Sequence, residues 1–174
     1  MTLISNRFWD FSIELYARKG VAEACLELQN SYGLDVNLVL FCFWSANQHG
    51  ELDEATLSKA ISFSATWRTE VVQPLRNVRR WMKDTGAIFA GDRQSHYDAL
   101  RERIKLDELA AEKYQQRVLE GLTADLGNNR NTSRSRSIAR KNLQNYLMTS
   151  GLMEDSSVRD LLQHIDEAIG WNPN

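Results

Sequence analysis

Apolar residues recur every three or four positions along most of the chain, and this spacing predicts α-helices. Strand-forming residues are sparse, and proline occurs only twice in the 174 residues, which also favours helices over sheets. We therefore predict an all-α fold, a compact bundle of seven or eight helices. A length of 174 residues fits one domain, so we expect 1–174 to form a single helical domain.

The spacing, together with glycines at helix ends, predicts helices over residues 6–18, 21–32, 36–49, 53–86, 95–126, 138–150 and 157–169. The helix over 36–49 is apolar nearly all round, which is typical of a helix buried on every side, so we place it at the centre of the bundle. The helix over 95–126 is the longest. Residues 87–94 are predicted to form a linker, and residues 128–137 a flexible basic loop.

Capping boxes at Ser95–Asp98 and Ser157–Asp160 are expected to open the long helix and the last helix. Pro74 interrupts the helix over 53–86, but the apolar positions stay in phase across it at about 100° per residue. That phase predicts one bent helix, or two abutting helices, with Val78 and Trp81 facing the core. Trp9, Trp44, Trp67 and Trp81 are all expected in the core, and any exposed tryptophan would mark a partner surface.

Charge is segregated along the chain, although its formal net value is only −2. Residues 67–94 carry six basic and three acidic side chains, and residues 126–153 carry five basic and no acidic ones. The first segment gives a basic helix face, Arg68, Arg76, Arg79 and Lys83, with Arg80 at its edge. The second gives a basic segment with Arg130, Arg134, Arg136, Arg140 and Lys141.

Each basic region has two interpretations. It can be a solvated surface, or it can bind an anionic partner such as a protein with acidic groups, a phosphate or RNA. Arg140 and Lys141 fall in the first turn of a predicted helix, where positive charge opposes the helix dipole, so local stability does not explain them. A protein partner is our first expectation. Nucleic acid is possible through residues 130–141, but five cations are few for a dedicated nucleic-acid binder.

An alternative site consists of acidic side chains at helical spacing on the first two predicted helices, Asp10, Glu14, Glu23 and Glu27. Carboxylates on facing helices can hold a magnesium ion and a diphosphate, so this pattern would suit a helical-pocket enzyme or a small-molecule binder. Arg7 and Arg18 lie three and four residues from members of the set, which instead favours a neutralised surface.

Motifs of catalysis and cofactor binding are absent from the sequence. The three histidines are far apart, and Cys25 and Cys42 lie in apolar runs, so we predict no catalytic residue, no metal site and no cofactor. The two cysteines do not form a disulfide framework, and the longest apolar run is well short of the roughly 20 residues that a membrane span needs. We expect a cytoplasmic protein.

The segment FWDFSIELYARKGVAEACLELQNSYGLDVNLVLFCFW (Phe8–Trp44), followed by Trp67-Arg68 and by PLRNVRRWMK (Pro74–Lys83), resembles a family of small bacterial proteins that is defined only as a domain of unknown function. The resemblance covers Phe8–Lys83 and implies a bacterial source and an all-helical fold. It assigns no catalytic residue. The leading hypothesis is therefore a non-enzymatic interaction or regulatory module whose basic surface meets an acidic or phosphate-bearing partner.

Overall fold

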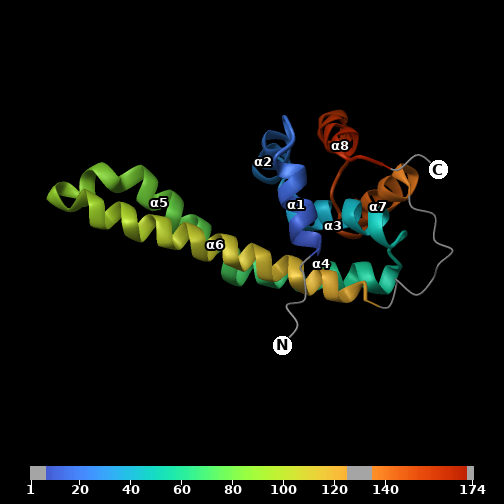
Figure 1. Ribbon diagram of the computed structural model, residues 1–174, viewed down its shortest axis with the longest axis horizontal. Helices are drawn as coiled ribbons and strands as arrows, with labels where there is room; N and C mark the ends of the chain where they lie inside the picture. The colour runs from blue at the N-terminus through green and yellow to red at the C-terminus, as the bar shows by residue number, and fades with distance from the viewer. Residues whose placement is uncertain (1–6, 125–134, 172–174) are drawn as a thin grey trace. The chain divides into compact units, whose positions relative to one another are not determined.

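The computed structural model describes residues 7–124 and 135–171, which contain eight α-helices and no strand (Figure 1). The helices are α1 (Arg7–Tyr16), α2 (Val21–Asn30), α3 (Val36–Gln48), α4 (Glu54–Trp67), α5 (Gln73–Phe89), α6 (Gln94–Leu122), α7 (Arg136–Thr149) and α8 (Ser156–Ala168). A π-helical turn, Arg68–Val72, precedes α5, and a 3-10 turn, Gly91–Arg93, precedes α6. The predicted all-α fold and the predicted long helix are confirmed.

The chain divides into two compact units. The first unit draws on Met1–Ser62 and Gln116–Asn174, and the second is Phe63–Gln115. The division falls within α4 and within α6, so both helices contribute to both units. The expectation of a single helical domain over 1–174 stays a prediction.

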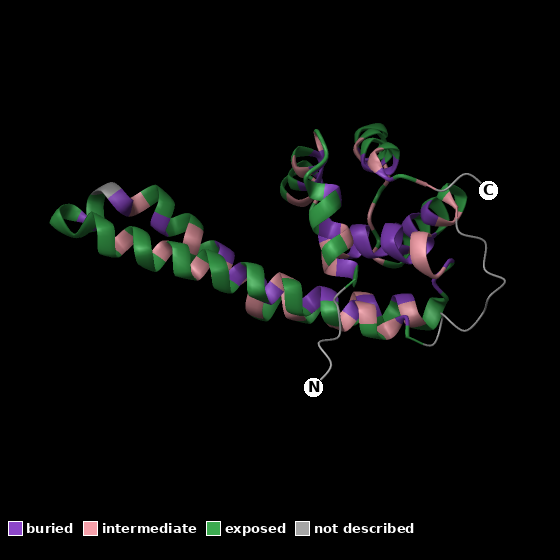
Figure 2. Ribbon diagram, viewed as in Figure 1, coloured by how far each residue is buried: buried purple, intermediate pink, exposed green. Residues whose placement is uncertain are grey.

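The core of the first unit is built around α3, as its apolar composition predicts. Leu38, Leu40, Phe41 and Phe43 are each at most 3% exposed, and Figure 2 shows α3 as buried through most of its length. Helices α1, α2 and α7 pack against α3, and α8 packs against α2. The ring of Phe8 on α1 lies 5.1 Å from that of Trp44, which extends the aromatic core from α3 into α1.

A buried amide on α7 ties the end of α3 to the loop that follows. The side-chain oxygen of Asn142 accepts a hydrogen bond from the Leu52 backbone N–H at 3.0 Å, and its nitrogen donates to the carbonyls of Cys42 and Gly50. Asn142 is fully buried. Buried backbone groups need partners, and this one side chain pairs with three of them, Leu52 and Gly50 in the loop and Cys42 within α3.

Four described helices begin directly after a residue whose side chain caps them. Asp35 accepts from the Asn37 N–H at the start of α3, Asp53 accepts from the Thr56 N–H at the start of α4, Ser135 caps α7, and Asp155 caps α8. The two predicted capping boxes are wrong, because Ser95 and Ser157 lie inside α6 and α8. For α8, Asp155 is two residues upstream, and its carboxylate accepts from the Val158 N–H at 2.8 Å.

The predicted facing of α5 is also wrong, and the π-helical turn explains why. A π turn holds more residues than an α turn, so it rotates every later side chain relative to a uniform count of about 100° per residue. Val72 and Met82 are buried, whereas Val78 and Trp81 are 46% and 53% exposed. Of the other three tryptophans expected in the core, Trp44 is buried and Trp9 and Trp67 are half-buried.

The second unit is a helical hairpin in which α5 and the part of α6 up to Gln115 lie side by side (Figure 1). The Tyr97 hydroxyl donates to the Met82 carbonyl near the turn, and at the other end the rings of Trp67 and Tyr114 lie 4.8 Å apart. The predicted linker over 87–94 is wrong, because α5 runs to Phe89 and α6 starts at Gln94. Across both units, none of the described helices has the length and apolarity of a membrane span.

Candidate functional site

The basic helix face on the 68–83 segment is largely engaged within the hairpin. Arg76 is 6% exposed, and its guanidinium donates to Glu108 at 2.8 Å and to Glu112 at 2.6 Å. Arg79 donates to the second oxygen of Glu108 at 2.5 Å. Burial alone would raise the pKa of Glu108, but the hydrogen bonds from Arg79 and Arg76 outweigh it and hold the pKa below its ordinary value.

These contacts change what the basic helix face can do. Arg76 cannot touch a partner in this conformation, because α6 covers it. Arg68 is half-buried and Arg80 is exposed, and each has an interaction within the chain. Partner binding by these arginines stays a prediction, with Arg76 now accounted for as a structural residue that joins α5 to α6.

The described part of the second basic segment lies at the start of α7 and faces acidic residues. Arg136 reaches Asp166 of α8 at 3.0 Å, and Arg140 reaches the same carboxylate at 3.8 Å. Lys141 pairs with Glu51 at 2.7 Å. Arg130 and Arg134 lie outside the described residues. Burial raises the pKa of Asp166 above its ordinary value, in spite of the nearby arginines and a hydrogen bond from Trp171.

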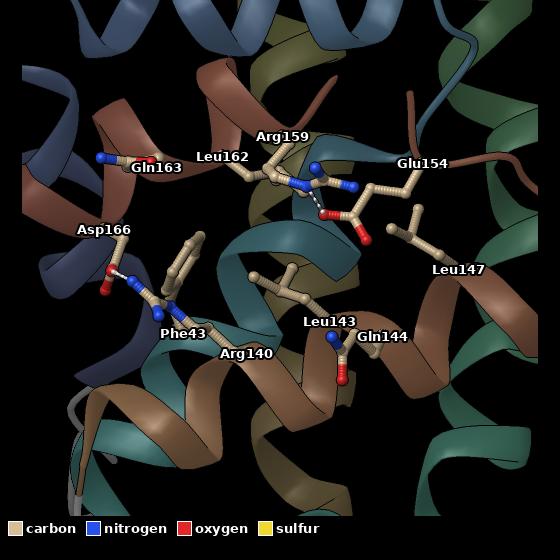
Figure 3. A pocket seen from close by; sticks show the side chains of 10 residues that line it. All are labelled: Phe43, Arg140, Leu143, Gln144, Leu147, Glu154, Arg159, Leu162, Gln163 and Asp166. Atoms are coloured by element: carbon tan, nitrogen blue, oxygen red, sulfur yellow. Dashed lines mark ion pairs between the residues drawn. The ribbon is translucent and has the colours of Figure 1, made fainter. Parts of the chain in front are cut away.

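A groove of about 370 Å³ lies between α7 and α8, beside this cluster. Its apolar floor is formed by Phe43, Leu143, Leu147 and Leu162, and its polar lining by Arg140, Gln144, Glu154, Arg159, Gln163 and Asp166 (Figure 3). Arg140 and Arg159 lie at the rim, with 63% and 64% of their side chains exposed.

The two helices present the same sequence pattern to this groove. Arg140–Gln144 and Arg159–Gln163 both read Arg-x-x-Leu-Gln, so in each helix the arginine, leucine and glutamine fall at i, i+3 and i+4 on one face. The sequence-based search found Arg140 but missed Arg159 and both glutamines. This five-residue repetition is the signal that could have identified them.

The acidic alternative site is only partly assembled. Asp10 and Glu14 line a second hollow of about 330 Å³, formed with Asn47, Gln48 and the Ile169–Gly170 turn. Arg7 and Arg18 line the same hollow, and Arg18 also donates to the Ala168 carbonyl. Glu23 and Glu27 are exposed on α2 and line neither the hollow nor the groove.

No group of His, Cys, Asp and Glu side chains among residues 7–124 and 135–171 has an arrangement that could hold a metal ion. Small-molecule binding at the acidic hollow therefore stays a prediction, and Asp10 and Glu14 are the members of the set positioned for it. The arginines beside them would limit the negative charge available to a cation.

Both cysteines and two of the three histidines, His49 and His164, have structural surroundings in the described residues. Burial raises the pKa of Cys25 to about 11 and that of Cys42 further, so neither thiol supplies a thiolate at neutral pH. His49 packs its ring 4.9 Å from that of Trp44, and the ring nitrogen of His164 lies 3.2 Å from the Lys19 carbonyl.

A family described as a protein of unknown function, DUF2390, matches residues 7–119. The chain belongs to this family. The match extends the resemblance seen in Phe8–Lys83 through most of α6, and it ends before α7 and α8. No curated protein and no solved structure matches the chain. Within the DUF2390 chain, the groove is therefore built mostly from residues that follow the matched segment, with Phe43 of α3 contributed from inside it.

Proposed function

We propose that this DUF2390 protein is a non-enzymatic interaction module, and that the groove between α7 and α8 binds an acidic segment of a partner protein. The observation that carries the proposal is the paired Arg-x-x-Leu-Gln pattern, which puts two guanidiniums and two carboxamides over an apolar floor. The proposed setting is a bacterial cytoplasm, which the two free cysteines support.

Both rim arginines are suited to a second acidic partner. Arg140 lies 3.8 Å from Asp166, and Arg159 lies 3.5 Å from Glu154, so each present ion pair is long, and both guanidiniums are mostly exposed. Because each guanidinium is largely in water, a long ion pair of this kind contributes about 0–1 kcal/mol. A carboxylate on a ligand would compete well for these groups, because guanidinium binds carboxylate through two parallel hydrogen bonds.

The interior of the groove suits a peptide rather than a bare anion. Leu143 and Leu162 supply an apolar surface, and the volume is at the lower end of the few hundred Å³ typical of ligand pockets, enough for one or two apolar side chains. Gln144 and Gln163 each carry both a donor and an acceptor, which is the chemistry that a peptide backbone needs. An acidic segment with an apolar side chain between its carboxylates fits these groups.

The residues that line the groove also favour binding over catalysis. They include no serine, threonine, cysteine, histidine or lysine, which are the usual nucleophiles and proton-transfer groups besides carboxylates. Its two carboxylates, Glu154 and Asp166, are both held in ion pairs with arginines. RNA binding through the whole basic segment, 130–141, is the competing outcome.

Fluorescence anisotropy with three labelled probes tests the proposal: a peptide of alternating Glu and Leu, the same peptide with Lys in place of Glu, and a single-stranded RNA. We expect the acidic peptide to bind best, and its affinity to fall with added salt. The double variant Arg140→Gln/Arg159→Gln should weaken this binding about tenfold or more, since two charge-assisted contacts are lost.

The matched control is Arg103→Gln/Arg117→Gln, which removes two exposed arginines of α6 that do not line the groove. It should bind the acidic peptide like the unmodified chain. The proposal is wrong if the two double variants bind alike, or if the Lys peptide binds as well as the Glu peptide. Preferential binding of RNA would also contradict the proposal, and would instead support nucleic-acid binding by the basic segment, 130–141.

A further inference from the structure

Helix α6 carries a short exposed stripe on the hairpin unit, made of Glu102, Leu106, Leu109 and Lys113. We name it the α6 stripe. Its members are spaced by four, three and four residues, so they share one face of the helix within about 60°. Leu106 is 62% exposed and Leu109 is 47% exposed.

The opposite face of α6 is the one that the hairpin covers. Glu108, Ala111 and Gln115 are all buried, and at about 100° per residue they fall on the far side of the helix from the α6 stripe. The stripe is therefore not part of the packing between α5 and α6. The two leucines at its centre lie on the exposed side of the helix. At one end is the Glu102 carboxylate, which pairs with Lys105 in the same chain, and at the other is the Lys113 ammonium, which also has an interaction within the chain.

This order of side chains is complementary to itself when the helix is reversed. If a second α6 runs antiparallel with a two-fold axis between Leu106 and Leu109, Leu106 faces Leu109 of the partner subunit. In the same register, Glu102 faces Lys113 of the partner subunit, and both contacts occur twice because the interface is isologous. In the antiparallel dimer, leucines therefore face leucines, and each charged side chain faces one of opposite charge.

We propose that the α6 stripe is a homodimer contact, and that its occupant is the same stripe of a second copy in antiparallel orientation. The order of the charges along the stripe, acidic at one end and basic at the other, favours a second copy as the partner. A different protein would need the same spacing of leucines and opposite charges to fit as well. Four leucines, two from each copy, give a small apolar centre, so the dimer is weak and concentration-dependent. This inference is independent of the groove proposed above.

A larger exposed apolar face exists on α5, and it serves as the comparison. It consists of Val78, Trp81, Ile88 and Phe89, and the rings of Trp81 and Phe89 lie 5.3 Å apart. An exposed patch of this kind marks a contact surface, but its apolar residues carry no charge order that would identify an occupant. Substitutions there separate the α6 stripe from apolar self-association in general.

Sedimentation velocity of the full chain over a concentration series tests the proposal. We expect a reversible monomer–dimer equilibrium. Glu102→Lys and Lys113→Glu should each weaken it about tenfold, because each turns two attractions into two repulsions. The double variant Glu102→Lys/Lys113→Glu restores opposite charges across the axis and should dimerise within about threefold of the unmodified chain.

Leucine substitutions supply the matched control. Leu106→Gln/Leu109→Gln should leave a monomer with unchanged helix content by circular dichroism, since both side chains are exposed. Leu100→Gln removes a leucine that is 53% exposed on another face of α6, and it should leave the dimer intact. Three results would overturn the proposal: a chain that stays monomeric up to its solubility, a double charge variant as weak as the single ones, or a dimer that only Trp81→Gln/Ile88→Gln dissociates.

Discussion

The hairpin depends on one carboxylate, Glu108, and removing it should destabilise the protein strongly. Its two oxygens accept from Arg76 and Arg79, and the side chains of Arg76 and Glu108 are each only 8% exposed. Breaking a buried ion pair from one side costs about 3–5 kcal/mol, because it leaves the other charge buried without a partner. Arg76 keeps Glu112 at 2.6 Å, so we expect Glu108→Ala to cost about 3 kcal/mol, the lower end of that range.

Urea unfolding at neutral pH, followed by far-ultraviolet circular dichroism, measures this loss. Glu102→Ala is the matched control, at a concentration low enough to keep the chain monomeric, since it removes the same side chain from the same helix where the carboxylate is 54% exposed and pairs with Lys105. That exposed pair should contribute less than about 1 kcal/mol. Equal losses from the two variants would refute the idea that the buried network stabilises the hairpin.

A replacement of both partners separates the ion pair from simple packing. The double variant Arg76→Leu/Glu108→Leu should be less destabilised than Glu108→Ala, since Arg76, the most buried of the charges that Glu108→Ala leaves behind, is removed as well. The pH dependence gives a second check. The folded-state pKa of Glu108 is lowered, so its contribution is present above the unfolded-state pKa and is lost as the pH falls through the folded-state value. Glu108→Ala should therefore flatten the acid limb of the stability profile.

Two further substitutions test the core. Gly20 and Gly33 both have positive φ, 79° and 70°, but a Cβ at Gly20 would lie 2.4 Å from the His164 ring nitrogen, whereas a Cβ at Gly33 would meet open space. Gly20→Ala should therefore lower the melting temperature more than Gly33→Ala. Adding His164→Ala to both variants should remove this difference. Asn142→Leu leaves the buried Leu52 backbone N–H without its partner and removes one hydrogen bond each from the Cys42 and Gly50 carbonyls, so urea titration should show a loss of about 3 kcal/mol. The half-buried Asn145→Leu should show much less, and equal losses would contradict the role given to Asn142.

The elements of this fold follow from the sequence where one residue property decides them. Helix α3 is predictable because its apolar residues leave it no polar face, and Asp35 fixes its start. The direction in which the side chains of α5 face is not predictable. No residue in Arg68–Val72 indicates a π turn, and that turn determines whether Trp81 is buried. Helical periodicity fixes the angle between side chains only while the turn stays regular.

The candidate site was predictable in part for a similar reason. Arg140 stood out because a cation in the first turn of a helix opposes the dipole, which is a property of one helix. Arg159 is a single cation in an acidic helix, and its meaning comes from the tertiary contact that sets it across from Arg140. The burial of Arg76 likewise depends on Glu108, which is 32 residues away along the chain.

The π-helical turn at Arg68–Val72 makes this part of the chain sensitive to length rather than to composition. Deleting any one of its five residues would let the helix run on as a regular α-helix, which is locally favourable. Every side chain after it would then turn by more than a quarter of a revolution, and Arg76 would point away from Glu108. Relatives that keep the hairpin should therefore vary freely in which residues fill this turn, while insertions and deletions there should be excluded.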